Sequence, residues 1–395
     1  MNPEDELLLC CARTRLDETQ AERIRELLQQ ELDWDFLLNS ALRHGMMPLV
    51  YWHLKSLGAE AMPEVMLDRF RDHFHQNLGH NLQLTAELFQ LINLFKAQGI
   101  PVITFKGPAL AASVYGNLAL RQFGDLDILV HEQDVPRAKQ VLIAAGYLPK
   151  YHLTPVQERH LMRIASEYPF TREDSDIEVE LHWALMPTSF YFPMHSNYLW
   201  DHLESIPLAG NTVQTLATED LLIYLCVHGF AHQWERLEWI CCIAELLRSK
   251  PDLNWKRIMS KAARLTVQPM LLTGLFLAHD LLGAPLPSNL VRKLHASPAV
   301  RALDQHVRGR LFARTQSPSG FLEGTLFTLR GRYRFKSKVR ALLHLLFSPT
   351  QYDLMLISLP ISFYPLYFVL RPMRLGSRHA LAPIKHFVSS KARKK

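Results

Sequence analysis

The chain of 395 residues is long enough to form two or three domains with their own hydrophobic cores. Hydrophobic residues make up 48% of it and charged residues 21%, as is typical of a soluble globular protein. The net charge of +6 suits a phosphate-rich ligand or an anionic membrane surface but does not by itself indicate nucleic-acid binding. The five cysteines are odd in number and include no Cys-x-x-Cys pair, which argues against a disulfide framework and a zinc site.

The first 98 residues predict a helical region. Apolar residues recur at spacings of three and four in four segments, which are residues 7–12, 21–32, 36–44 and 82–95. The last segment is followed by Gly99, a favourable helix stop. We expect this region to pack on a sheet or to cover a cleft.

The N-terminus and the cysteines also bear on the cellular compartment. The start MNPEDELLLCCARTR has neither the basic beginning nor the sustained apolar core of a secretory signal peptide. Two adjacent cysteine pairs and one single cysteine lie in helical patterns, so we expect reduced and mostly buried thiols. These features predict a cytoplasmic protein without a disulfide-linked partner.

Residues 102–130 form the stretch with the most specific pattern. A β-branched and aromatic run at 102–105 predicts a strand that leads into Lys106 and Gly107. Gly107 permits a tight turn, and Pro108 stands at the first position of a following helix. Because the N–H groups at a helix start are free, this turn can face an anion.

A second strand follows and carries two carboxylates. Alternation places Asp125 and Asp127 on one face, which we expect to line a cleft, and an apolar set on the core face: Leu126, Ile128 and Val130. Two ionised carboxylates this close repel each other unless a cation lies between them. Mg²⁺ typically takes one or two carboxylates together with substrate phosphates, so the pair is a candidate metal site.

Two other Asp-x-Asp patterns lack this context. Residues 33–35 open a helical pattern and are interpreted as a helix cap and a first-turn acid. Residues 174–176 lie in a charged turn. The pair at 125 and 127 alone follows a strand, a glycine turn and a helix.

A helix that begins at Asp134 and ends before Gly146 separates the acid-bearing strand from strand-like residues at 147–152 and near Tyr168. The clearest later strand is residues 176–183. One of its faces is apolar, and the other holds three polar residues: Glu178, Glu180 and His182. This polar face is either the solvent side of an edge strand or the wall of a cleft.

From residue 218 the pattern is helical again. A single helix is expected over 218–250, on which His228, His232 and Arg236 recur every four residues and form one polar stripe. Because no Glu follows the first His and no third ligand is evident, a hydrogen-bonding stripe that faces the cleft is favoured over a zinc site.

The C-terminal part contains a basic run and an apolar segment. The run RGRYRFKSKVR either contacts phosphates or a membrane surface, or it begins a solvated helix. The apolar segment 354–370 is at the short limit for a membrane span and contains Pro360 and Pro365, each of which breaks a helix locally. A pair of short helices is favoured over membrane contact and over a span, and a basic tail follows.

The motifs FKGPALAASVYGNLALRQFGDLDILV, VELHW and VHGFAHQWERLEW together resemble a bacterial nucleotidyltransferase family of the polymerase-β-type nucleotidyltransferase superfamily, often linked to exopolysaccharide or peptide-modification genes. The order of strand, glycine turn, helix and Asp-x-Asp strand, with a third acid on a later strand, carries the resemblance. It implies an α+β fold with a small mixed β-sheet core at residues 99–215, flanked by helical regions at 1–98 and 216–395.

The resemblance also implies a site. Glu180 matches the family's third carboxylate, so the implied catalytic and metal-binding residues are Asp125, Asp127 and Glu180. Because Lys106 and Gly107 stand where Gly-Ser is usual, Lys106 is expected to replace the missing serine as a phosphate contact. The implied nucleotide-binding residues are Lys106, Gly107, Arg121 and His182. As alternatives, Lys106 ends a strand in solvent and Arg121 pairs with Asp125.

The implied activity is metal-dependent nucleotidyl transfer. With Mg²⁺ or Mn²⁺, a nucleoside monophosphate would pass from an NTP, ATP by analogy, to a hydroxyl of a sugar, peptide, protein or RNA, with release of pyrophosphate. One alternative is a non-catalytic nucleotide-binding or scaffold protein on the same fold, associated with the inner membrane through its C-terminal region in polysaccharide production. Another is phosphoryl transfer, which would release ADP.

Overall fold

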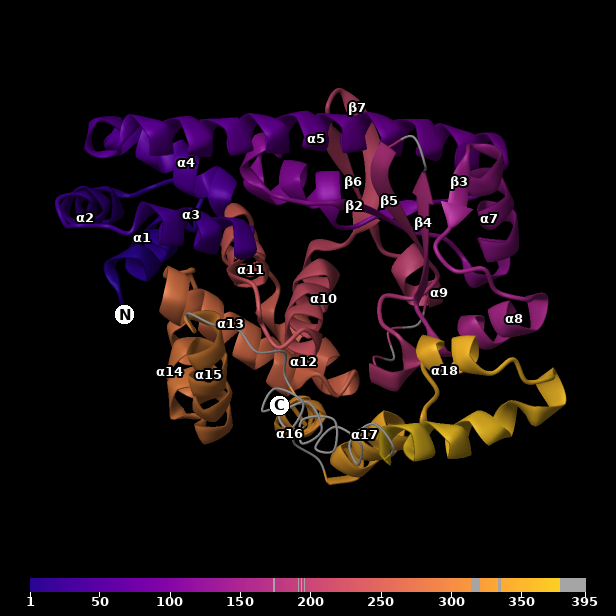
Figure 1. The fold of residues 1–395 in the computed structure, drawn as a ribbon. Helices are drawn as coiled ribbons and strands as arrows, with labels where there is room; N and C mark the ends of the chain where they lie inside the picture. Colours follow the sequence, from indigo (N-terminus) through magenta and orange to yellow (C-terminus); the bar gives the residue numbers. More distant parts are fainter. Residues whose placement is uncertain are drawn as a thin grey trace, which may run out of the picture.

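The computed structural model (Figure 1) describes residues 1–376 with the exception of residues 173–174, 191, 193, 195, 314–319 and 333–334. A five-stranded mixed sheet and a two-stranded sheet lie between an N-terminal and a C-terminal set of helices. This arrangement confirms the predicted α+β fold class. The basic tail after residue 376 lies outside the described residues.

Five α-helices precede the first strand, which confirms the predicted helical region, although α4 and the first part of α5 match none of the four predicted segments. They are α1 (Pro3–Cys11), α2 (Glu18–Leu28), α3 (Trp34–Arg43), α4 (Met47–Leu57) and α5 (Glu64–Ala97), with a 3-10 turn η1 (Ala59–Ala61) before α5. Helix α5 has 34 residues and runs across the top of the molecule in Figure 1. Its first half buries Phe70 and Phe74 in a helical core, and its second half buries Leu84 and Leu88 in the core of the sheet. One long helix therefore joins the two cores.

The central sheet has the strand order β1-β2-β5-β4-β3. Its strands are β1 (Ile103–Thr104), β2 (Asp125–Leu129), β3 (Tyr147–Pro149), β4 (Glu167–Arg172) and β5 (Ser175–His182). Strands β2 and β5 are parallel, whereas the other neighbours are antiparallel. The parallel pairing brings the two acid-bearing strands side by side. The second sheet is a hairpin of β6 (Leu203–Leu208) and β7 (Asn211–Leu216).

The connection from β1 to β2 is less regular than the single helix predicted from the sequence. A four-residue helix, α6 (Gly107–Leu110), continues into a π-helical turn, η2 (Ala111–Tyr115), which ends at Gly116 with a φ of +69°. A 3-10 turn, η3 (Leu118–Leu120), then leads to β2. In this connection, α6 packs against β2.

Two helices cover the part of the sheet that contains β3 and β4. Helix α7 (Val135–Ala144) packs against β3 and β5, and it follows the 3-10 turn η4 (Glu132–Asp134). Helix α8 (Pro155–Ile164) begins with a capping box in which Thr154 and Gln157 hydrogen-bond reciprocally. The turn η5 (Thr188–Phe190) and α9 (Ser196–Trp200) connect β5 to the hairpin.

The region after the hairpin is helical, as predicted. Its helices are α10 (Thr218–Ala231), α11 (Leu237–Ser249), α12 (Trp255–Arg264), α13 (Gln268–Leu282), α14 (Ser288–Ala296), α15 (Pro298–Leu311), α16 (Phe321–Arg330), α17 (Phe335–Phe347) and α18 (Gln351–Leu356). A 3-10 turn, η6 (Ile361–Leu366), and a helix over residues 367–376 follow. The apolar segment thus forms short pieces, as favoured above. In the described ranges, no helix has the length and apolar composition needed to cross a membrane.

The prediction of one helix over residues 218–250 is wrong. The chain leaves the helix between α10 and α11, where Gln233 and Trp234 have φ values of +54° and +56°. The Trp234 side chain is fully buried and packs directly on Gly229, where a Cβ would overlap its ring. Burial of this large ring against α10 turns the chain back, so His232 and Arg236 lie outside both helices and form no continuous helical stripe with His228.

Candidate functional site

Strands β2 and β5 carry the acidic residues into one cluster. In their parallel register, Asp127 lies opposite Glu180, and Leu129 lies opposite His182. Asp127 is 1% exposed, whereas Asp125 and Glu180 are half-buried at the wall of a cavity. The other face of β2 is core, as alternation predicted, because it buries Leu126, Ile128 and Val130.

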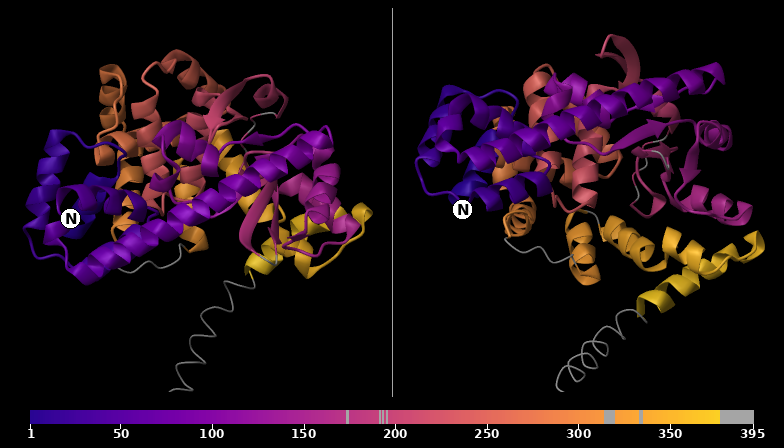
Figure 2. Two further views of the ribbon diagram at one scale, coloured as in Figure 1. Left: turned by 90° about the horizontal axis from the view of Figure 1, so that it is seen from above. Right: turned by 45° about the horizontal axis from the view of Figure 1, so that its top comes forward.

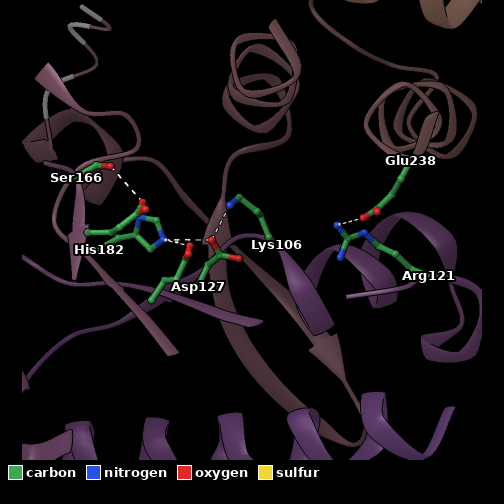
Figure 3. A network of polar contacts seen from close by, with 8 residues as sticks. Lys106, Arg121, Asp127, Ser166, His182 and Glu238 are labelled. Carbon is green, nitrogen blue, oxygen red and sulfur yellow. Dashed lines mark hydrogen bonds and ion pairs between the residues drawn. The ribbon is translucent and has the colours of Figure 1, made fainter. Parts of the chain in front are cut away.

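Lys106 closes one side of the cluster (Figure 3). It follows β1, and its Nζ donates a hydrogen bond to Asp127 Oδ1 at 2.7 Å. The next residue, Gly107, has a φ of +48°, and a Cβ there would lie 3.3 Å from the carbonyl oxygen of Asp125. Glycine therefore lets the turn pass close to β2 and holds the lysine at the carboxylate.

His182 lies between three carboxylates. Its Nε2 is 3.1 Å from Asp127 Oδ1 and 3.3 Å from Glu180 Oε2, and its Nδ1 is 3.4 Å from Glu167 Oε2. Burial disfavours the charged imidazole, but the hydrogen bonds to Asp127 and Glu180 outweigh it and raise the pKa of His182 to about 10. The imidazolium therefore bridges the acids at neutral pH, and its Nε2 can bind a metal only after it has lost that proton.

The pKa values of the other ionisable groups in the cluster are shifted by burial and by the neighbouring charges. Burial opposes ionisation of Asp127, but Lys106 and His182 hold the pKa of its carboxyl well below the usual range. Burial and the charge of Asp127 raise the pKa of Asp125. Burial also opposes the charge of Lys106, yet Asp127 holds the pKa of the ammonium well above its usual value. Asp127, Lys106 and His182 thus stabilise one another as ions in a largely buried cluster.

Three side chains have the geometry of a metal site. Among the described residues, one ligand atom each from Asp127, Glu180 and His182 lie within 4.8 Å of one another. Oδ2 of Asp127 is buried and accepts no hydrogen bond from this part of the chain, so one carboxylate oxygen is open to a cation. Two carboxylates and an imidazole fit a divalent cation. This group contains His182 in the place where the sequence predicted Asp125.

Arg121 has a different partner from the one considered above. Its Nη2 donates to Glu238 Oε1 at 2.8 Å, and Arg236 Nη2 lies 2.8 Å from Oε2 of the same carboxylate. Gly45, with a φ of +68°, passes beneath Glu238, where a Cβ would overlap the carboxylate. Arg121 is therefore fixed in a buried ion pair with Glu238 (Figure 3).

The site residues face one cavity of about 1270 Å³. Lys106, Arg121, Asp125, Glu180 and His182 line it from the sheet side. From the helical side it is lined by residues of α10, α11 and the loop between them: His228, His232, Arg236 and Trp239.

The three aromatic rings on the helical side are in contact. The centroid of His232 lies 4.6 Å from that of His228 and 5.1 Å from that of Trp239. The three residues of the predicted stripe thus line the cavity, although His228 lies on α10 and His232 and Arg236 lie in the connection between α10 and α11.

Sequence reasoning did not single out two acids of the site. Glu167 begins β4 and lies opposite His182 in the antiparallel register of β4 and β5. Only that pairing reveals its role. Glu238 is the second residue of α11 and lies near the end of the VHGFAHQWERLEW motif, and its partner Arg121 lies 117 residues away. The one available signal was that both ends of this ion pair fall within the most specific motifs.

Comparison with known proteins gives one match, to a family model. A family model described as uncharacterised nucleotidyltransferase matches residues 30–283. No curated protein and no solved structure matches the chain. The matched residues cover more than half of the chain and extend from the N-terminal helices through α13, so they contain every residue of the cluster.

Proposed function

The chain belongs to the family of uncharacterised nucleotidyltransferases, and from this premise we propose that it transfers a nucleoside monophosphate from an NTP to a hydroxyl-bearing acceptor, with a divalent metal as cofactor. The observation that carries the proposal is the cluster of Asp127, Glu180 and His182 at a cavity large enough for a nucleotide. ATP as the donor and Mg²⁺ or Mn²⁺ as the metal are part of the proposal.

Each residue of the cluster has a proposed task. Asp127, Glu180 and His182 would hold the metal, and Asp125 would add a carboxylate at the cavity wall. The ammonium group of Lys106 lies next to Asp127 at the wall of the cavity, so it can contact a phosphate oxygen that enters the cavity. When bound, a divalent metal would neutralise charge on the phosphates and on the leaving group.

The proposed reaction needs little covalent chemistry from the protein. The acceptor hydroxyl releases its proton to solvent, and its oxygen forms a bond to the α-phosphorus as the bond from that phosphorus to the pyrophosphate oxygen breaks in line. The protein contributes by positioning both reactants and by placing positive charge where negative charge develops. The acceptor class is a hydroxyl of a sugar, a peptide, a protein or an RNA.

The proposed setting is a reducing compartment such as the cytoplasm. All five cysteines are buried and free. Thiols of this kind are usual in proteins of reducing compartments.

One observation favours a second candidate function, a nucleotide-binding protein without turnover. Lys106 and His182 both contact Asp127 Oδ1, so two cations of the chain already neutralise the carboxylate. A site of this kind can bind phosphates through Lys106 without a catalytic metal. Oδ2 of Asp127 and the carboxylate of Glu180 point to metal binding and favour the enzyme.

Labelled nucleotides distinguish the candidates. Purified protein and an Asp127→Asn variant are incubated with each α-³²P-labelled NTP and Mg²⁺, with and without cell extract, and pyrophosphate is measured. A parallel reaction uses γ-³²P-labelled ATP. Circular dichroism and thermal unfolding show whether the variant keeps the fold.

The proposal predicts α-label on an acceptor and equimolar pyrophosphate with the wild type, and neither with the folded variant. Transfer of the γ-label with release of ADP would instead identify the reaction as phosphoryl transfer. Nucleotide binding without transfer of either label, in the presence of extract, would favour the binding protein.

A further inference from the structure

Exposed apolar side chains gather in one part of the molecule. In the described part of the chain, fifteen of the twenty-two exposed large hydrophobic residues lie between Leu326 and Met373. This segment runs along the lower edge of the molecule in Figure 1, on the opposite side from α5. Figure 2 shows from a second direction that it lies at the periphery. A contiguous exposed apolar surface of this kind marks an interaction site.

Helix α17 shows how the surface is built. One side of the helix packs inward, where Ala341 and Leu345 line the candidate cavity. The other side is a stripe of exposed apolar residues at helical spacing: Phe335, Val339, Leu342, Leu343 and Phe347. Exposed Lys336 and Lys338 lie on the same helix. Such a helix is amphipathic, but its apolar side has no cover among the described residues.

The neighbouring short elements extend the stripe. Phe368 joins α17 in a shallow groove of about 580 Å³, lined mainly by apolar atoms. Further exposed apolar side chains lie in α18, η6 and the helix after it: Met355, Leu356, Phe363, Leu366, Val369 and Met373. We call α17 together with residues 351–376 the apolar-basic face.

The charge of this region is the second, independent observation. Residues 324–395 hold fourteen of the 44 lysines and arginines but one of the 38 acidic residues, which leaves 30 basic and 37 acidic residues in the rest of the chain. The single acid, Asp353, is buried and paired with Arg374 at 2.5 Å. The protein is therefore acidic over most of its length and strongly basic at the apolar end.

We propose that the apolar-basic face docks on an anionic lipid bilayer. Exposed leucine, phenylalanine and methionine side chains would enter the boundary between headgroups and acyl chains, and the lysines of α17 would contact anionic headgroups. A second copy of the chain is a poorer occupant, because its face carries the same excess of positive charge. RNA is a poorer one, because most of the exposed apolar side chains of the face are leucine, isoleucine, valine or methionine, which offer bases no aromatic ring for stacking.

This inference is independent of nucleotide transfer. It concerns a surface that contains none of the residues proposed to hold the metal or the phosphates. Docking would place the candidate cavity beside the bilayer, because α17 contributes to both.

Vesicle sedimentation tests the proposal. The full chain, without nucleotide, is mixed with vesicles of neutral phosphatidylcholine and with vesicles that also contain phosphatidylserine. We expect sedimentation with the anionic vesicles, weakened by added salt. The double substitution Leu343→Gln with Phe347→Gln should weaken the apparent affinity about ten-fold or more. The pair Lys336→Gln with Lys338→Gln should weaken it and reduce its salt dependence.

Matched variants control for folding and net charge. Leu82→Gln with Leu94→Gln changes two exposed leucines of α5, and Lys256→Gln with Lys293→Gln removes the same charge from exposed positions of α12 and α14. Both pairs should bind vesicles as the wild type does. Binding that the face variants leave unchanged, or no binding to anionic vesicles, would overturn the proposal.

Two further measurements show whether a second copy of the chain or RNA binds the apolar-basic face instead. Dimerisation in light scattering that is lost in the Leu343/Phe347 variant, without vesicle binding, would assign the face to a second copy. RNA retention without vesicle binding would assign it to nucleic acid. Nucleotidyl transfer is assayed separately in the face variants, so loss of docking and loss of activity are distinguished.

Discussion

The two carboxylate oxygens of Asp127 have different surroundings. Oδ1 contacts Lys106 Nζ at 2.7 Å and His182 Nε2 at 3.1 Å. Oδ2 is buried and accepts no hydrogen bond from the described residues. A buried oxygen without a partner destabilises the fold, so it is typical of a position shaped for a ligand. This asymmetry is the reason for assigning a metal to Oδ2.

Substitution of Glu180 by Gln tests whether its charge acts in the proposed reaction. We expect metal-dependent transfer to fall about 10²- to 10³-fold, because a charged oxygen that faces the metal is lost. Glu178→Gln is the matched control, since Glu178 lies two residues away on β5 and pairs with Lys150 at 2.8 Å. Steady-state rates of both variants are compared with the wild type. Equal rates for the two variants would contradict the proposed role of Glu180 in metal-dependent transfer.

Glu167 is proposed to orient His182 from behind. Its Oε2 lies 3.4 Å from Nδ1, the imidazole nitrogen opposite the one near Asp127. Removing such an outer partner typically lowers metal affinity about 10- to 100-fold, so Glu167→Gln should do the same here. Mn²⁺ titrations measure the affinity, and the rate at saturating metal should recover most of its wild-type value. A rate that saturating metal fails to restore would show that Glu167 acts otherwise.

Strand alternation was enough to place Asp127, Glu180 and His182 on polar faces. It could not show that His182, rather than Asp125, joins the other two at one point, because this depends on the parallel register of β2 and β5. The partner of Arg121 was also out of reach. Glu238 is distant in the sequence, and only tertiary packing of α11 on the β1–β2 connection brings it near.

At the scale of elements, the junction of α10 and α11 depends on one glycine. Gly229→Ala should destabilise the protein by about 1–3 kcal/mol, because the new Cβ overlaps the buried Trp234 ring and forces repacking. Gly79→Ala on α5 meets open space and should stabilise by about 0.5–1 kcal/mol through helix propensity. Urea unfolding measures both. A destabilised Gly79→Ala or a neutral Gly229→Ala would contradict this packing.

The start of α11 is expected to make stability depend on pH. His44 Nδ1 accepts a hydrogen bond from the Leu237 N–H at 3.3 Å. Burial, with the charges of Arg43 and Arg236, lowers the pKa of His44 to about 3. As the pH falls, His44 therefore binds a proton in the unfolded chain before it does so in the folded protein. The contribution of neutral His44 to the free energy of unfolding is complete above about pH 6.5 and decreases below it.

This loss amounts to about 1.4 kcal/mol per pH unit at most as the pH falls toward 3. In His44→Asn, where an amide oxygen can accept the same hydrogen bond, the free energy of unfolding should decline less steeply between pH 6 and 4. Urea titrations at several pH values give both slopes. Parallel curves would contradict the assigned role of His44.

Element types were largely predictable, and breaks within elements were not. Apolar spacing identified the N-terminal helices, and alternation identified β2 and β5. The division at residues 232–236 has no glycine or proline to announce it, since it arises from burial of Trp234. The π-helical turn after α6 likewise depends on how the connection fits against β2 rather than on local propensity.

At the scale of the whole molecule, the candidate cavity is enclosed by distant parts of the chain. The sheet contributes the acids, α10 and α11 contribute the aromatic side, and Arg332, Leu345 and Tyr352 of the C-terminal segment also line it. One hydrophobic core contains residues of both α1 and α13, so the N-terminal and C-terminal helices pack together. The domain limits near residues 98 and 216 stay predictions.

The central claim is that Asp127, Glu180 and His182 hold the metal on which transfer depends. Electron paramagnetic resonance of Mn²⁺ measures this most directly, since bound and free ions give different signals. We expect wild type and Glu178→Gln to bind Mn²⁺ equally and more tightly with ATP present. We expect Asp127→Asn, shown by circular dichroism to be folded, to bind it at least about ten-fold more weakly. Equal Mn²⁺ binding by Asp127→Asn and the wild type would contradict the account.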